Sequence, residues 1–510
     1  MNITSSPNLL IRGRWLIQDA QTIIPDGALL VSDGRVARVG RWPALRREFP
    51  ALPVIGHEGQ AIMPGLINAH HHSNGITAQQ QGIPDQLLEL WLLSLAGRRP
   101  ASVYLATLLS AARLLRTGVT AVVDVHQGRG SAAAFRDGVS QGLHAYDEAG
   151  MRVAYAAGMA ESSYLVWGED KAFLDGLPAE VRALAQQRLP GPDNLSIDDY
   201  FAVMAELQAA YAAHERIDVW FGPPGPQWVA DNTYQRMAAL AEERGVGIQT
   251  HLLESLYEKL HGPRAYGMST VQHLDALGVL SPRFSLAHGV WLSEADLAIL
   301  AARGTHVSHN PSSNLRLRAG VAPLNGMMAA GVSIALGMDG TTINDDEDMF
   351  AEMRLALRLH RTPEIDGPAP APEEIWQMAT EGGARLLQKD GQIGRLAPGY
   401  QADVVLLNLD RLLWPWTAPE APPLPLLLTR AQAGDVDTVL VGGEVVLRGG
   451  QPTRFDVAAA AAELAEQLAQ AQPSAEAKAL VETLTPHVAA HYRGWEHPSL
   501  QPYEARNSKQ

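Results

Sequence analysis

Short apolar runs alternate with longer amphipathic stretches through the middle of the chain, from about residue 61 to residue 387. The runs have the length of buried strands, and the stretches between them have helical spacing. This alternation is typical of a parallel α/β fold, in which a covering helix follows each strand. The predicted strands are residues 61–70, 119–127, 152–161, 217–225, 245–254, 284–291, 305–311 and 332–340.

Eight strands are the number that a closed (β/α)8 barrel of the TIM type requires, and this stretch of chain is long enough to include insertions. Most polar residues of the runs lie at their carboxyl ends, where such barrels carry their chemistry. A doubly wound open sheet is the alternative, but no glycine-rich phosphate loop follows any run. We therefore expect residues 61–390 to form a (β/α)8 hydrolase barrel.

Strand-like segments separated by turns occupy both ends of the chain. Residues 28–40 contain an Asp-Gly hairpin signal, and a similar texture returns at residues 401–410 and 436–450. We expect residues 1–60 and 391–455 to form one small composite β-sandwich domain. Residues 456–510 begin Ala- and Glu-rich. They are expected to form a C-terminal helical tail, a surface helix followed by an extended arm, to which the sequence assigns no function.

Composition narrows the class of protein. The chain has 510 residues, 46% of them apolar and 19% charged, which is ordinary for a globular enzyme with a large core. A formal net charge of −15 argues against a nucleic-acid partner. No apolar run is long enough to span a membrane and the N-terminal residues lack a secretory pattern, so a cytoplasmic protein is expected. We expect a small-molecule substrate and a homodimer, the commonest assembly.

The absence of cysteine excludes disulfides and thiolate metal sites, which leaves histidines and carboxylates as the expected metal ligands. Three consecutive histidines, His70, His71 and His72, end the first predicted barrel strand. Residues i and i+2 of a strand share one face, so His70 and His72 can converge while His71 faces away toward the helical layer. Taken alone, such a pair could equally mark a partly exposed strand.

Other strand ends carry the same kind of residue. His251, His288 and Asp339 close the fifth, sixth and eighth predicted strands. Each alone could be a core histidine or a turn residue. Their recurrence at the strand ends of one barrel favours a metal site, because several neutral imidazoles and a carboxylate suit a divalent ion with an open position for water.

Ordered motifs extend this pattern along the chain. They are MPGLINAHHH, THLLES, SLAHGVWL, HNPSSNLRLRAGVAP, ALGMDGTTINDDEDMFAEMRLA and IGRLAPGYQADVVLLN. Over residues 9–450 the chain resembles the amidohydrolase superfamily, and within it the metal-dependent aminohydrolase and chlorohydrolase branch. This branch includes guanine, S-adenosylhomocysteine, cytosine and triazine deaminases.

The resemblance implies roles for the residues of these motifs. It implies four metal ligands: His70, His72, His251 and Asp339. It further implies that His288 contacts or orients the metal-bound hydroxide, that Glu254 is the proton shuttle, and that Asp339 takes the proton of the water. The catalytic residues are thus expected to be Glu254, His288 and Asp339.

The fourth predicted strand bears on the number of metal ions. Two-metal relatives carry a bridging residue there, usually a carboxylated Lys and sometimes Glu. Residues 217–228 read IDVWFGPPGPQW, with no Lys, Glu or Cys at the strand end. One divalent ion is therefore expected, Zn or alternatively Fe, since a nitrogen and oxygen ligand set accepts both.

The expected function is a mononuclear metal-dependent hydrolase in which hydroxide attacks an sp² carbon, most simply the deamination of a cyclic amidine in a triazine, pyrimidine or purine. Glu254 favours a nitrogen leaving group, because ammonia departs only after a basic nitrogen gains a proton. Hydrolysis of another C–N or C–Cl bond is an alternative. A non-catalytic amidohydrolase-like scaffold is another, although such proteins typically lose ligands that this chain keeps.

Substrate contacts are expected from the segment after the histidine pair, residues 73–100, which is rich in Leu and carries Trp91; a helix packed on the barrel is the alternative. Gln227, Trp228 and His309 are further candidates, the last matching a strand-seven histidine of the family. Pro224 stands where related purine deaminases often have a His or Cys that reads the substrate. This departure weakens the case for purine or nucleoside recognition.

Two arginines have two possible roles each, and two further histidines are interpreted as structural. Arg316 and Arg318 could bind a substrate carboxylate or form surface salt bridges, and relatives commonly have Gly where Arg318 stands. His126 and His306 lie near predicted strand ends and are interpreted as structural.

Overall fold

The computed structural model describes residues 8–471 and 474–501. Residues 1–7, 472–473 and 502–510 lie outside the described residues, and with them the start of the expected β domain and the end of the expected arm. No helix in the described part of the chain is long and apolar enough to cross a membrane.

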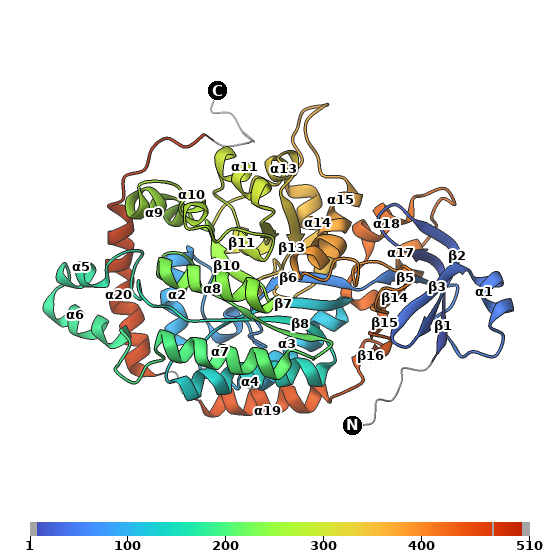
Figure 1. Cartoon of the computed structure of the whole chain (residues 1–510), viewed down its shortest axis with the longest axis horizontal. Helices are drawn as coiled ribbons and strands as arrows, with labels where there is room; N and C mark the ends of the chain where they lie inside the picture. Colours follow the sequence, from blue (N-terminus) through green and yellow to red (C-terminus); the bar gives the residue numbers. More distant parts are fainter. Residues whose placement is uncertain (1–7, 472–473, 502–510) are drawn as a thin grey trace.

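Eight parallel strands form the centre of the molecule (Figure 1). They are β6 (Leu66–His71), β7 (Val119–Gln127), β8 (Arg152–Gly158), β9 (Ile217–Phe221), β10 (Ile248–Leu252), β11 (Phe284–His288), β12 (His306–His309) and β13 (Ser333–Leu336). Each strand pairs with its neighbour in sequence, from β6 to β13. The backbone amides of Met338 and Asp339 then donate to the carbonyl of His70, at 3.2 and 2.9 Å, which joins the end of β13 to β6. The predicted barrel is confirmed.

Helices surround the barrel because each amphipathic stretch buries its apolar face on the strands. Serine side chains cap several of them: Ser102 Oγ accepts from the amide of Leu105, and Ser131 Oγ from that of Ala134, both at 3.3 Å. Helices that follow the strands along the chain are α3 (Val103–Arg116), α4 (Ala132–Ala149), α7 (Ile197–Tyr211), α8 (Asp231–Arg244), α9 (Leu256–Tyr266), α10 (Thr270–Ala276), α11 (Glu294–Arg303), α13 (Leu324–Ala329) and α14 (Met349–Leu359).

Further helices occur elsewhere along the chain. They are α1 (Trp42–Glu48), α2 (Leu88–Ser94), α5 (Asp170–Asp175), α6 (Ala179–Ala185), α12 (Pro311–Arg316), α15 (Pro372–Gln377), α16 (Gly383–Leu386), α17 (Asp410–Leu413) and α18 (Pro423–Arg430). Of these, α2 follows β6 at its carboxyl end and lines the pocket described below, whereas α5 and α6 follow β8 and only residues on either side of them, such as Trp167 and Arg188, line it.

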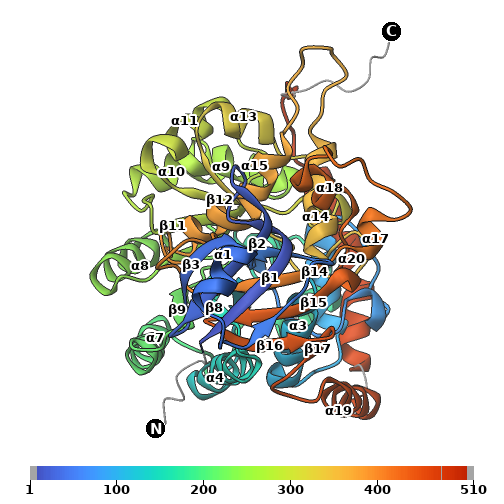
Figure 2. The same cartoon turned by 90° about the vertical axis from the view of Figure 1, so that its right-hand side faces the viewer.

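Both ends of the chain contribute to a second, mixed sheet in front of the barrel (Figure 2). Its strands are β1 (Leu9–Ile17), β2 (Ile23–Ser32), β3 (Arg35–Arg41), β4 (Val54–Ile55), β5 (Gln60–Pro64), β14 (Val404–Asn408), β15 (Val436–Val441), β16 (Glu444–Arg448) and β17 (Gln451–Pro452). The expected sandwich takes the form of one curled sheet: the amide of Ala402 donates to Gly34 O and that of Val36 to Tyr400 O, both at 2.9 Å.

The segment predicted as one strand at residues 61–70 is two strands in different sheets. Its first part is β5, which pairs with β1 and β14, and the barrel begins only at β6. Gly65 separates them, and a Cβ there would lie 2.0 Å from Thr120 Oγ1. The chain can therefore pass this close to β7 only because glycine has no side chain.

The tail is helical, as expected, but it is more than a surface helix. Helix α19 (Val457–Gln470) packs beside α3, and α20 (Ala475–Arg493) stands at the opposite end of the molecule from the mixed sheet (Figure 1). Leu484 and Tyr492 of α20 are buried in an apolar cluster with Leu93 and Trp167. The tail thus closes one side of the barrel mouth.

Candidate metal centre and its pocket

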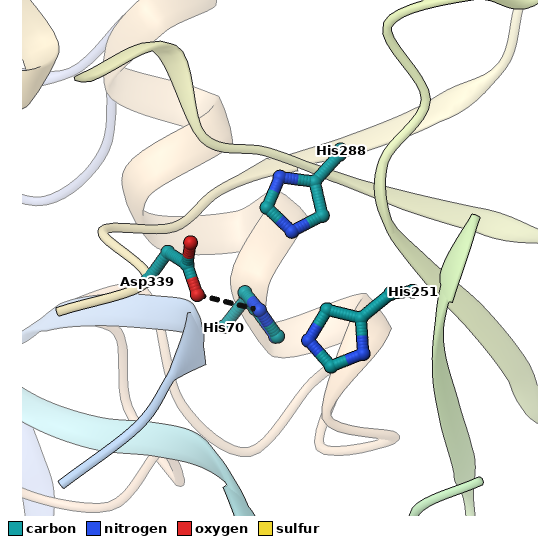
Figure 3. A group of neighbouring side chains, drawn as sticks. All are labelled: His70, His251, His288 and Asp339. Carbon is teal, nitrogen blue, oxygen red and sulfur yellow. Dashed lines mark ion pairs between the residues drawn. The ribbon is translucent and has the colours of Figure 1, made fainter. Parts of the chain in front are cut away.

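Five predicted site residues converge at the carboxyl ends of the strands. His70, His251, His288 and Asp339 each present one ligand atom, all within 4.8 Å of one another, and Figure 3 shows these side chains facing a common point. His72 joins them, with its Nε2 3.1 Å from His251 Nε2 and 3.3 Å from Asp339 Oδ1. The strand-end interpretation therefore places these side chains together, although they come from β6, β10, β11 and the segment after β13.

Backbone carbonyls orient two of the imidazoles. His72 Nδ1 lies 2.9 Å from Val125 O, and His251 Nδ1 lies 2.7 Å from Pro224 O. A carbonyl oxygen only accepts, so each Nδ1 carries the proton and donates it. In both rings the lone pair of Nε2 is consequently turned toward the centre.

Side-chain amides orient the other two. His70 Nδ1 lies 2.9 Å from Gln249 Oε1, and the Gln249 Nε2 donates to Ala69 O at 2.9 Å, which keeps its oxygen toward the ring. His288 Nδ1 lies 3.0 Å from Asn314 Oδ1. Partners of this kind set the tautomer and ring position of metal-binding histidines.

The result is a buried group of acceptors without donors. His70 Nε2 and His288 Nε2 are buried and make no hydrogen bond, and the two facing Nε2 atoms of His72 and His251 cannot bond to each other when both are lone pairs. Buried acceptors normally have a partner. A divalent cation satisfies all of these atoms together with the Asp339 carboxylate, so the residues present fit one metal ion.

Electrostatics agrees with this donor set. Burial lowers the pKa of His72 to about 3 and that of His288 to about 4, so both rings are neutral near pH 7. Burial alone would raise the pKa of Asp339, but the neighbouring imidazoles of His70, 3.0 Å away, His288 and His72 hold it well below its usual range. Neutral imidazoles beside an ionised carboxylate are the ligands that zinc-like ions bind.

Backbone strain is concentrated at the same place. His288 has φ 78° and Asp339 has φ 58°, in the left-handed region that non-glycine residues seldom adopt. Such conformations cost about 1–3 kcal/mol each and cluster at functional sites. Here they turn the side chains of His288, the last residue of β11, and Asp339, which follows β13, toward the candidate metal centre.

Glu254 lies at the edge of the centre. Its Oε2 is 3.3 Å from His288 Nε2, and its Oε1 is buried without a hydrogen bond. Burial, followed by the negative charges of Asp339, Glu258 and Glu89, raises the pKa of Glu254 well above its usual range. The carboxyl group can therefore hold a proton at neutral pH and donate it to a ligand in the pocket.

His71 faces away from the centre, as the alternation of strand side chains predicts. Its Nε2 lies 2.7 Å from Ser110 Oγ on α3 and 3.6 Å from Glu347 Oε2. The ring is fully buried behind β6, and burial lowers its pKa to about 4. His71 thus belongs to a polar contact between the barrel and α3.

A cavity of about 1160 Å³ opens above the centre. Trp91 and Trp228 line it, as expected of substrate contacts, and the Trp91 indole Nε1 is buried there without a hydrogen bond. Trp228 packs edge-to-face on Trp167, with ring centroids 4.6 Å apart. Aromatic walls of this kind suit a flat ring.

Gln227 and His309 lie behind the residues that line the cavity. Gln227 Nε2 donates to Glu258 Oε1 at 2.9 Å, and Glu258 in turn accepts from the amide of Glu254 at 2.6 Å. His309 Nε2 lies 2.9 Å from His360 Nε2. The structure therefore places both as supports of the wall.

Glu89 and Tyr492 line the cavity although they were not among the predicted site residues. Glu89 of α2 accepts from Trp167 Nε1 at 3.1 Å and from Ser255 Oγ, and its Oε2 is buried without a partner. A lone carboxylate in the apolar run LLELWLL was a usable signal. Tyr492 of α20 also lines the cavity, its hydroxyl accepting from the amide of Trp167 at 2.9 Å. Nothing local in the tail indicates that role.

Arg316 and Arg318, for which a carboxylate site and salt bridges were the two interpretations, have different surroundings. Arg316 forms ion pairs with Asp85 and Asp345, with 2.8 Å between the closest atoms of each pair, so the salt-bridge alternative holds for it. Arg318 has φ 55°, in the left-handed region that glycine adopts most easily. His306 bonds Ser333 Oγ and is structural, whereas His126 lines the cavity.

The segment after β9 carries no carboxylate or lysine toward the centre. It contains Pro224, whose carbonyl instead accepts from His251. Among the described residues, the group that includes His70 and Asp339 is the only set of potential ligands found in one place. The chain thus offers no bridge for a second ion in its described part.

Comparison with known proteins agrees with this geometry. Residues 61–446 match the amidohydrolase family. A 5-methylthioadenosine/S-adenosylhomocysteine deaminase of Nitratidesulfovibrio vulgaris (strain DP4) is 32% identical over 445 residues, 86% of this chain and 91% of the relative. A 5'-deoxyadenosine deaminase of Methanothermobacter thermautotrophicus is 32% identical over 432 residues, 83% of this chain and 90% of the relative.

Solved structures share the architecture. An adenosine deaminase from Xanthomonas campestris with bound zinc superposes with a TM-score of 0.77 and 27% identity, over 90% of this chain and 98% of that one. An atrazine chlorohydrolase from Arthrobacter aurescens TC1 complexed with zinc has a TM-score of 0.75 at 22% identity, over 90% and 100%, which bears on the fold alone. The chain belongs to the amidohydrolase family.

Proposed function

We propose that this amidohydrolase is a metal-dependent deaminase of an adenine nucleoside. The observation that carries the proposal is the convergence of buried imidazole lone pairs and the Asp339 carboxylate beside Glu254, at the floor of an aromatic-walled cavity. The names of the relatives support the choice of an adenine ring among N-heterocycles. The inference from Pro224 against nucleosides loses its basis, because that residue supports His251 through its carbonyl.

His70, His72, His251 and Asp339 would hold one divalent ion, with His288 beside it. When bound, such an ion acts as a Lewis acid that makes hydroxide available from water near neutral pH. We propose zinc, supported by the zinc bound in structurally similar proteins.

The side chains around the ion divide the proton transfers. Glu254, protonated in its buried position, donates to the ring nitrogen next to the amino-bearing carbon, which makes that carbon electrophilic. The ionised Asp339 accepts a proton from the attacking water, and His288 Nε2 orients that water by accepting a hydrogen bond. The water oxygen adds to the carbon, and Asp339 passes the proton it took from the water to the exocyclic amine. The bond between carbon and that amine breaks, the hydroxyl proton of the adduct passes to Glu254, and ammonia leaves with the ring in its carbonyl form.

Hydrolysis of a ring chloride or another C–N bond is the second candidate, since the same attack serves those reactions. Glu254 favours an amine, which needs a proton to leave. A non-catalytic scaffold conflicts with the complete acceptor group. We further propose a cytoplasmic homodimer, consistent with the acidic, cysteine-free composition and the frequency of twofold assemblies; light scattering of the purified protein tests the dimer.

The test is ammonia release by the zinc-loaded protein from a panel of adenine nucleosides, guanine, cytosine and a chlorotriazine. We expect deamination of an adenine nucleoside, and a loss of kcat of about 10²–10⁴-fold in Glu254→Gln with metal content unchanged. Glu243→Gln, at an exposed position on α8, is the control. Full activity in Glu254→Gln would contradict the proton-shuttle role, and chloride or alkylamine release without ammonia would contradict deamination.

A further inference from the structure

Four arginines line the cavity above the candidate metal centre: Arg98, Arg99, Arg129 and Arg188. Arg99 is already engaged, because its Nη1 donates to the carbonyl of Leu468 at 3.0 Å, which leaves Arg98, Arg129 and Arg188. They come from the segments that follow β6, β7 and β8, which are adjacent strands of the barrel. The cavity therefore collects positive charge on one side, in a chain whose net charge is −15.

These arginines lack the acidic partners that neutralise others in this protein. Arg98 Nη1 donates to the neutral amide oxygen of Asn74 at 2.8 Å. Arg129 and Arg188 form no hydrogen bond or ion pair within the part of the chain that the structure describes. Arg316, by contrast, is paired with Asp85 and Asp345.

The acid that attracts Arg188 electrostatically is already engaged. Asp170 attracts Arg188 electrostatically, but its two carboxylate oxygens accept from the amides of Tyr164 and Leu165, at 3.0 and 2.9 Å. Those bonds fix the loop after β8. Asp170 is therefore a cap of that loop and does not form an ion pair with the guanidinium.

The three charges also lie close enough to repel one another. Burial, and then the charge of Arg129, lowers the pKa of Arg188 to about 10, and the same two causes lower the pKa of Arg98. With a pKa of about 10, Arg188 still carries its charge at neutral pH. Arg98 and Arg188 are half-buried and Arg129 is exposed at the rim of the cavity, and cations without acidic partners are stabilised when an anion binds between them.

Arg98 is connected to the candidate metal centre through Asn74. Its partner Asn74 donates through Nδ2 to the carbonyl of His72 at 3.1 Å. A ligand bound to Arg98 is therefore separated from the backbone of His72 only by the side chains of Arg98 and Asn74. The 1160 Å³ cavity is large enough for a nucleoside that carries a further polar group.

We propose that Arg98, Arg129 and Arg188 form an anion subsite that binds a carboxylate or phosphate carried by the substrate heterocycle. The inference rests on the proposed function and narrows its substrate class to nucleosides with an anionic substituent. A planar guanidinium pairs with either group through two parallel hydrogen bonds, which gives both affinity and orientation. Trp91 and Trp228 line the same cavity and offer the base an aromatic wall.

Three substrates with the same base separate the possibilities: 5'-methylthioadenosine, which is uncharged, S-adenosylhomocysteine, which carries a carboxylate, and adenosine 5'-monophosphate. We expect Arg129→Gln to lower the ratio of kcat/KM for an anionic substrate to that for 5'-methylthioadenosine by 10-fold or more, and Arg188→Gln to act in the same direction. Arg129 is exposed, so its replacement leaves the fold intact. Arg136→Gln, on an exposed ion pair with Glu206, is the matched control.

If the variants lower the kcat/KM ratio only for S-adenosylhomocysteine, the subsite binds a carboxylate. If they lower it only for adenosine 5'-monophosphate, the subsite binds a phosphate, and either result supports the proposal. Unchanged ratios in both variants overturn it. If no nucleoside is deaminated, the proposed function fails, and the subsite is judged by thermal melting with adenosine 5'-monophosphate or inorganic phosphate. A stabilisation in the native protein that Arg129→Gln abolishes supports the subsite, and no stabilisation overturns it.

Discussion

The imidazoles of the candidate metal centre are held by oxygen acceptors, and this contact determines what each ring can do. With the Nδ1 proton donated to Gln249, Val125 O or Pro224 O, the Nε2 lone pair of the ring points to the shared centre. A ring in the other tautomer would present an N–H to a cation and could not bind it. The residues behind the ligands are therefore as important as the ligands.

Replacing Gln249 with Met tests this support. The substitution removes the acceptor of His70 Nδ1 without emptying the space, so the ring is no longer fixed in one tautomer. We expect zinc affinity to fall by about 10–100-fold, the usual effect of losing such a partner. Chelator competition measures the affinity. Gln470→Met, at an exposed position on α19, should match the native protein, and native affinity in Gln249→Met would contradict the role.

The histidine triplet supplies a second prediction at this scale. His70→Gln should abolish stoichiometric zinc, because its Nε2 faces the centre. His71→Gln should retain zinc and lose stability by about 1–3 kcal/mol, because its bond to Ser110 is buried. Metal analysis and urea unfolding measure the two quantities. Loss of zinc in His71→Gln would show that the middle ring also supports the centre.

At the scale of elements, α20 matters because it joins three parts of the pocket wall. It packs on α2 and α6. The hydroxyl of Tyr492 accepts from the backbone amide of Trp167, and the indole Nε1 of Trp167 donates to Glu89. The family match ends at residue 446, so this wall is built by a segment beyond it. The helix thereby shapes the cavity without approaching the reacting atoms.

Tyr492→Phe isolates that contribution. The change leaves the buried amide of Trp167 without its acceptor, so we expect a loss of about 1–3 kcal/mol in unfolding free energy. The wall should loosen, raising KM several-fold while kcat stays within about twofold, since proton transfer is done elsewhere. Steady-state kinetics and urea unfolding test both. Tyr211→Phe at the end of α7 is the control, and an unchanged KM would contradict the role of α20.

At the scale of the whole molecule, a buried ion pair joins the barrel to the mixed sheet. Arg152, the first residue of β8, bonds both carboxylate oxygens of Asp403, at 2.7 and 3.1 Å, and Asp403 also accepts from the amide of Gly442. The sheet thus covers the amino-terminal end of the barrel. The carboxyl-terminal end, with the metal centre, is left to the loops and α20.

Arg152→Met should therefore destabilise the protein by about 3–5 kcal/mol, because it leaves Asp403 as an unpaired buried charge. The exposed pair of Arg136 and Glu206 is the comparison: Arg136→Met should change the unfolding free energy by about 0–1 kcal/mol. Urea unfolding measures both variants. Equal effects would show that the buried pair does not couple the two sheets.

The sequence by itself determined the order of strands and helices and the type of metal ligand. Alternating apolar runs specify strands and helices locally, so the eight barrel strands could be predicted. The lack of cysteine restricted the ligands to histidine and carboxylate, and strand alternation separated His70 and His72 from His71. Each of these conclusions depends on residues close together in the chain.

Only the tertiary structure decided which atoms support and enclose the site. The acceptors of His72 and His251 are backbone carbonyls, which every residue has, so no side-chain pattern marks Val125 or Pro224. The division of residues 61–70 between two sheets, the docking of Tyr492 and the gathering of three arginines likewise depend on segments far apart in sequence. Packing of the complete chain brings such segments together, and local preference carries no information about it.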